Sequence, residues 1–108
     1  MSKTIAIIGA GPAGLAAAAH AIERGLTPLI LERGPAIGHA VRQWAHVPMF
    51  SPWAFNIDAA AGRLLAATGW NRPAPDAYPT GSDLVGQYLA PPAERTAFQA
   101  VGLSLTRL

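Results

Sequence analysis

The sequence predicts an α/β fold that opens with a Rossmann-like β-α-β unit of a parallel sheet. A short apolar run, Ile5–Ile8, is followed directly by a glycine-rich loop, Gly9–Gly14. An alanine-rich stretch comes next, and a second apolar run, Pro28–Leu31, ends in Glu32. A strand, a glycine turn, a helix and a second strand in this order are typical of the start of a doubly wound α/β domain.

Each part of this unit has a physical reason. The run Ile5–Ile8 does not alternate, so we expect a strand with both faces buried, as in a parallel sheet under helices. Gly9 permits the tight turn out of the strand, Gly11 lets a phosphate approach the backbone, and Gly14 lets the helix lie close to the strand. Pro12 suits the first helical turn, where its missing N–H has no intrahelical partner.

The helix that follows is predicted to pack on the sheet through Leu15, Ala18 and Ile22, which share one face. Gly25 stands where helices commonly end in a left-handed residue. His20 lies off the apolar face, and we expect it to be solvated. Glu32 comes eighteen residues after Gly14, at the end of the second strand.

A glycine loop that opens a helix points free N–H groups and the positive end of the helix dipole at an anion. An acid after the second strand accepts hydrogen bonds from ribose hydroxyls and repels a 2′-phosphate, which argues against NADP here. Arg33 would approach the adenosine ribose or the phosphates, or else be a solvated loop arginine. The sequence therefore predicts a dinucleotide site formed by Gly9, Gly11, Pro12, Ala13, Gly14, Glu32 and Arg33.

The same stretch has two other interpretations. One is a glycine turn in another kind of β-α-β unit. The other is a signal peptide, because Lys3 precedes apolar residues and alanines. The glycines and Pro12 interrupt the apolar core that a signal peptide needs.

These residues resemble the FAD-binding start of two-dinucleotide-binding flavoproteins, which include flavin-containing monooxygenases and disulfide reductases. The resemblance covers about residues 3 to 91. Besides the glycine loop and Glu32, further pieces resemble a flavin-containing-monooxygenase-like subgroup of FAD/NAD(P)-binding oxidoreductases. They are Val41-Arg42-Gln43-Trp44, His46-Val47, Phe50-Ser51-Pro52-Trp53 and Pro79-Thr80-Gly81.

The resemblance implies FAD as the cofactor and a flavin-dependent, NAD(P)H-linked oxidoreductase or monooxygenase as the function. Because 108 residues are too few for two dinucleotide-binding domains, we expect a truncated, N-terminal part of a longer enzyme. NAD(P)H binding is then expected only with the remainder, and the 108-residue chain alone is expected to be inactive. The alternatives are a nucleotide-binding fragment without activity of its own and half of an NAD-binding dehydrogenase. No catalytic residue can be named.

The expected partial domain has three parts. Residues 3–32 form the β-α-β core, residues 33–91 a loop and helical insertion, and residues 92–108 a tail. The tail is either a third parallel strand or sequence diverted by truncation or a frameshift.

Within the insertion, residues 40–57 are rich in aromatic residues and prolines and follow neither a helical nor a strand period. In the resembled family this region passes near the isoalloxazine, which makes His46 and Ser51 candidates for pocket residues. The alternative is a packed, proline-stiffened loop. His39 stands where many FAD proteins have a second glycine after the one at Gly38, so a side chain occupies a place where backbone often nears the cofactor.

Two helices are predicted later in the insertion. The first is capped by Asp58, runs through Thr68 and stops at Gly69. The second opens with a capping box between Thr80 and Asp83 and ends before Pro91-Pro92. Its apolar residues are Leu84, Val85, Tyr88 and Leu89.

Composition excludes several classes of function. The net charge is +2 and the basic residues are scattered, so nucleic acid is not an expected partner. There is no cysteine, so the disulfide-reductase branch has no support from this segment. His39 and His46 have no neighbouring ligand set, so no metal site is predicted. No apolar run has the length of a membrane span, and a soluble cytoplasmic protein is expected.

Overall fold

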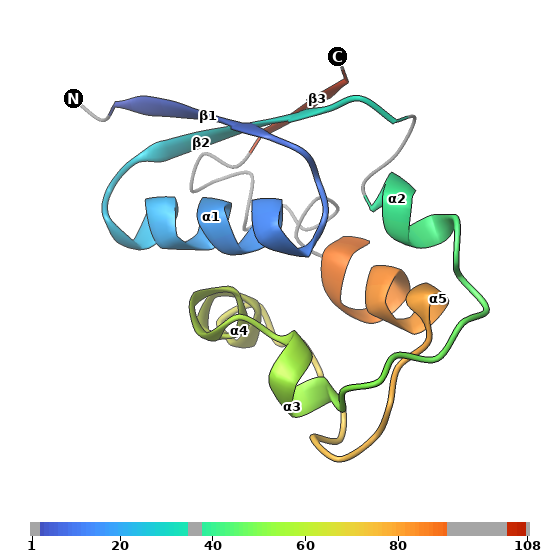
Figure 1. Ribbon diagram of the computed structural model, residues 1–108. Helices are drawn as coiled ribbons and strands as arrows, with labels where there is room; N and C mark the ends of the chain where they lie inside the picture. The colour runs from blue at the N-terminus through green and yellow to red at the C-terminus, as the bar shows by residue number, and fades with distance from the viewer. Residues whose placement is uncertain (1–2, 35–37, 91–103, 108) are drawn as a thin grey trace.

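The computed structural model describes residues 3–34, 38–90 and 104–107. Two strands, β1 (Thr4–Ile8) and β2 (Thr27–Glu32), flank helix α1 (Pro12–Glu23). The insertion holds the short helices α2 (His39–Arg42) and α3 (Trp53–Asn56), the longer α4 (Ala59–Ala66), α5 (Gly81–Leu84) and the π-helix η1 (Val85–Leu89). Strand β3 (Ser104–Arg107) completes the described elements. The helices lie on one side of the sheet, with α1 between the sheet and α4 (Figure 1).

The described strands form one parallel sheet in the order β1-β2-β3. In β1 and β2, Thr4 faces Thr27 and Ile8 faces Leu31 across the ladder. In β2 and β3, Leu29 pairs with Ser104 and Glu32 with Arg107. The predicted α/β fold is thereby confirmed, and the tail supplies the third parallel strand over residues 104–107.

The expectation that both faces of the first strand are buried is wrong for the part of the chain that the structure describes. Ile5 is 42% exposed and Ile8 is 71% exposed. Ile8 is exposed because α1 covers the opposite face of β1, where Ile7 packs against the core, while no described element covers the face of Ile8. β1 is also an edge strand among the described ones, with β2 as its neighbour.

The core lies between the sheet, α1, α4 and the α5–η1 segment. Leu15 and Ala18 of α1 are buried and Ile22 packs against them, as predicted. The principal buried partners from the other elements are Ile30, Ala60, Ala61, Leu65, Leu84, Tyr88 and Leu89. Burying each leucine or isoleucine side chain of this core stabilises the fold by roughly 1.5–3 kcal/mol relative to leaving that side chain exposed.

Both predicted helix caps are present. The Asp58 carboxylate accepts a hydrogen bond from Ala61 N at 3.0 Å and begins α4. Thr80 and Asp83 form the reciprocal capping box, with bonds of 3.0 and 3.1 Å. α4 ends at Ala66 and not at Thr68, and the two predicted stop residues Gly25 and Gly69 have φ of +76° and +79°.

Three features were not foreseen. The α-helix that opens at Gly81 changes to π-helical hydrogen bonding at Val85. The region predicted to lack regular structure contains the four-residue helices α2 and α3, which are too short to show a period in the sequence. His20 is half-exposed, in keeping with its predicted place off the apolar face, but its Nε2 also lies 3.3 Å from a carboxylate oxygen of Asp58, the cap of α4, and the sequence did not reveal that contact.

Two sequence expectations concern absences. Among residues 3–34, 38–90 and 104–107, no three histidine, cysteine or acidic side chains gather as a metal site would require. None of the helices in these ranges combines the length and the apolar character that crossing a membrane demands.

Candidate nucleotide-binding site

The loop between β1 and α1 has the geometry that its glycines predict. Gly9 has a φ of +104°, a conformation that side chains rarely adopt, and its N–H donates to Leu31 O at 2.7 Å. At Gly14, an added Cβ would collide with the backbone carbonyl of Gly9. Gly14 therefore lets α1 start directly against the end of β1, as the sequence predicts.

The N-terminus of α1 presents backbone donors. Pro12 is the first helical residue, and the first hydrogen bond of the helix runs from Leu15 N to Gly11 O at 3.0 Å. The amides of Ala13 and Gly14 precede that bond and have no acceptor within the helix. Space above Gly11 is open, since an added Cβ would meet nothing within 4 Å. The free backbone amides, the dipole of α1 and the open space above Gly11 together suit the binding of an anion such as a diphosphate.

Glu32 closes the site from the end of β2. Its Oε1 accepts from Ala10 N at 2.8 Å and its Oε2 accepts from Gly34 N at 2.5 Å. The hydrogen bond from Gly34, followed by that from Ala10, lowers the pKa of Glu32 below its ordinary value of 4.5. The side chain is thus a carboxylate at neutral pH, and both of its oxygens already hold backbone donors.

The segment at the start of α2 forms the opposite wall. Gly38 N donates to Ala10 O at 2.8 Å, which connects this segment to the glycine loop. The backbone of Gly38 lies against Val85 and Leu89 of η1. His39 lies against Gly34, because a Cβ added to Gly34 would collide with the imidazole ring. The insertion is thereby attached to the core at the site.

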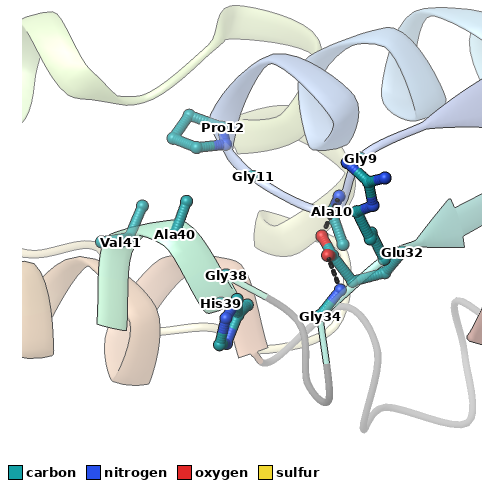
Figure 2. A pocket seen from close by; sticks show the side chains of 11 residues that line it. Gly9, Ala10, Gly11, Pro12, Glu32, Gly34, Gly38, His39, Ala40 and Val41 are labelled. Atoms are coloured by element: carbon teal, nitrogen blue, oxygen red, sulfur yellow. Dashed lines mark hydrogen bonds between the residues drawn. The ribbon is translucent and has the colours of Figure 1, made fainter. Parts of the chain in front are cut away.

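These parts line an open-sided cavity of about 500 Å³, within the usual size range of small-molecule sites. Figure 2 shows the glycine loop on one side and the Gly38–Val41 segment on the other, with Glu32 hydrogen-bonded between two backbone amides. The lining comprises Gly9, Ala10, Gly11, Pro12, Glu32, Arg33, Gly34, Gly38, His39, Ala40 and Val41.

Of the predicted site residues, the structure brings together Gly9, Gly11, Pro12, Glu32 and Arg33 around this cavity. Ala13 and Gly14 lie just behind the lining, in the first turn of α1. Sequence reasoning placed His39 where backbone often nears the cofactor, but it did not include the wall from Gly38 to Val41 among the site residues. His39, which stands where many FAD proteins have a second glycine, is therefore a residue of the cavity lining.

The two candidates from the aromatic-rich stretch lie elsewhere. Ser51 Oγ donates to Asn56 Oδ1 at 2.7 Å, so the serine fixes its own loop ahead of α3. His46 is exposed. Neither belongs to the lining of the cavity.

The structure is similar to that of the THI4 protein of Thermovibrio ammonificans, with a TM-score of 0.53 and 20% sequence identity. The likeness covers 98% of this chain and 37% of that protein, so the chain spans well under half of its length. At this identity the likeness establishes the fold alone. No curated protein is a significant match to the sequence. A family model does match, over residues 6–97, and the chain therefore belongs to the pyridine nucleotide-disulphide oxidoreductase family.

Proposed function

We propose that this chain is the FAD-binding portion of a flavin-dependent oxidoreductase that takes its electrons from NAD(P)H. The observation that carries the proposal is the cavity itself. It joins an open glycine loop, the N-terminus of α1 and a carboxylate at the end of β2. Family membership supports oxidoreductase chemistry of this class.

The residues present fit the adenosine diphosphate half of a dinucleotide. The amides of Ala13 and Gly14 and the dipole of α1 would hold the diphosphate over Gly11. Glu32 would accept from the adenosine ribose, and its charge disfavours a 2′-phosphate at that place. Arg33 lines the same cavity and would add a positive charge beside the phosphates. Bound FAD would supply the redox step, while the protein contributes binding and orientation.

Within this proposal, monooxygenase and other oxidoreductase activities are both open. The chain contains no cysteine, so none of these 108 residues can form a redox-active disulfide. The NAD(P)H site is proposed to lie outside this chain, because the sequence has one G-x-G-x-x-G loop and no second.

A second candidate is half of an NAD-binding dehydrogenase, which the same loop and Glu32 would also serve. Direct titration of the purified chain with FAD, NAD and ADP separates the two. FAD binding at least as tight as that of ADP, with weaker NAD binding, supports the flavin proposal. Tight NAD binding without retention of FAD supports the dehydrogenase instead.

The matched control for this titration is Gly11→Val. A Cβ at Gly11 would meet nothing within 4 Å in the ligand-free protein, and the same space is where the diphosphate would lie. The variant should fold and lose FAD binding. If Gly11→Val binds FAD as tightly as the parent chain, the ligand does not occupy this loop.

A further inference from the structure

The peptide groups of Ala10 are held from two sides. Ala10 is 2% exposed, its N–H donates to Glu32 Oε1 at 2.8 Å, and its carbonyl accepts from Gly38 N at 2.8 Å. Just before it, Gly9 N donates to Leu31 O at 2.7 Å. Two of these three bonds join backbone to backbone. The third is accepted by the side chain of Glu32, so a substitution at residue 32 can remove this hydrogen bond while the backbone groups of the loop remain.

The second oxygen of the same carboxylate reaches a different loop. Oε2 accepts from Gly34 N at 2.5 Å, two residues further along the chain. Gly34 in turn lies beneath the ring of His39 at the start of α2. One carboxylate thus connects the glycine loop with the loop after β2, and both loops line the cavity (Figure 2).

We propose that Glu32 is a positioning residue, whose carboxylate holds the glycine loop and the Gly34 loop in their binding shape before any ligand arrives. Its share in dinucleotide affinity then comes through this preorganisation, in addition to any contact with ribose hydroxyls. The inference rests on the proposed function for the ligand, while its structural half concerns the ligand-free protein alone.

A carboxylate suits this role and an amide does not. Two backbone N–H donors converge on Glu32, and an ionised carboxylate offers acceptor oxygens to both. Glutamine offers one oxygen and one NH₂ group, so one of the two backbone donors would face another donor. Glu32→Gln should release one loop while keeping nearly the same volume, and Glu32→Ala should release both.

The first arm of the test is amide hydrogen exchange on the full ligand-free chain. In Glu32→Ala the amides of Ala10 and Gly34 should exchange about tenfold faster or more, the change expected when a charge-assisted hydrogen bond is lost. In Glu32→Gln one of the two should do so. The amide of Leu65 in α4 should keep its exchange rate, which separates loop release from general unfolding.

Glu23→Gln changes an exposed carboxylate that is bonded to Arg63, so it is the matched control and should alter exchange in neither loop. Unchanged exchange at both loop amides in Glu32→Ala overturns the proposal.

The second arm is calorimetric binding of ADP and of 2′,3′-dideoxy-ADP, which lacks both ribose hydroxyls. If Glu32 acts through the loop, Glu32→Gln should weaken binding of the dideoxy probe about tenfold and binding of ADP by at least as much. If it acts through the hydroxyls alone, the variant weakens ADP and leaves the dideoxy probe unchanged, which overturns the preorganisation role. A parent chain that binds neither probe refutes the proposed function, and the exchange arm still decides whether Glu32 holds the loops.

Discussion

The hydroxyl oxygen of Tyr88 accepts a hydrogen bond at 3.0 Å from the backbone N–H of Asp58. Tyr88 belongs to η1 and is 1% exposed, while Asp58 is the cap of α4. The bond therefore joins two elements 30 residues apart in the sequence. Burial of the ring, the largest cause, raises the pKa of Tyr88 above 10.0, so the phenol stays neutral at physiological pH.

Replacing Tyr88 by phenylalanine should destabilise the fold by about 1–3 kcal/mol, because the partly buried N–H of Asp58 loses its acceptor. Urea unfolding of the variant measures this loss. Tyr78→Phe is the control, since that tyrosine is exposed. Equal unfolding free energies for the two variants would contradict the prediction.

Substitution by alanine should lower the stability of the fold at Gly14 but not at Gly11. Gly14→Ala forces a Cβ against the Gly9 carbonyl, and since that neighbour is backbone, α1 or the loop must move. We expect a loss of about 1–3 kcal/mol in the free energy of unfolding, as for an overpacked core. Gly11→Ala meets nothing within 4 Å and has an extended backbone, so it should retain stability. Thermal unfolding of the pair is the measurement. A Gly14→Ala variant as stable as Gly11→Ala would show that α1 does not rest on β1 in this way.

Stability should fall in acid partly through Glu32. The hydrogen bonds from Gly34 and Ala10 favour its ionised form, so its pKa in the folded protein lies below the ordinary 4.5. A depressed carboxyl pKa contributes stability that is present above about pH 4.5 and is lost as the pH falls through the folded value. Parent and Glu32→Gln chains should therefore differ in unfolding free energy at about pH 7 and converge towards about pH 3. A difference that is the same at both pH values would mean that the carboxylate charge is not what holds the loops.

The chain alone should not turn over NAD(P)H. Hydride transfer requires the nicotinamide to be held against the flavin, and the sequence contains one glycine-rich dinucleotide loop. The test is NADPH consumption by the purified chain with FAD and oxygen present, with light scattering recorded in parallel. Exposed Ile5 and Ile8 on β1 should make the chain prone to associate. Sustained, FAD-dependent consumption by a monodisperse sample would overturn the expectation that this segment needs a further domain.

Much of the fold could be predicted because its signals are local. A glycine loop between two apolar runs, the caps at Asp58 and Thr80, and stop glycines each depend on a few neighbouring residues, and the structure contains them. What the sequence did not reveal concerns distant contacts. Both faces of β1 were expected to be buried, but Ile8 is exposed because no described element covers its face of the strand. The contact between His20 and Asp58 exists because α4 packs against α1.

The sequence by itself determined the β-α-β unit and the chemistry of its loop, because backbone conformation at Gly9, close approach at Gly14 and charge at Glu32 are properties of single residues. Only the tertiary structure decided what completes the site. It brought Gly38 and His39 against the loop at Gly34 and Ala10, and it directed the Glu32 carboxylate to two backbone amides. No period or motif carries that information, because a hydrogen bond between segments depends on where the intervening helices pack and not on which residues are neighbours in the chain.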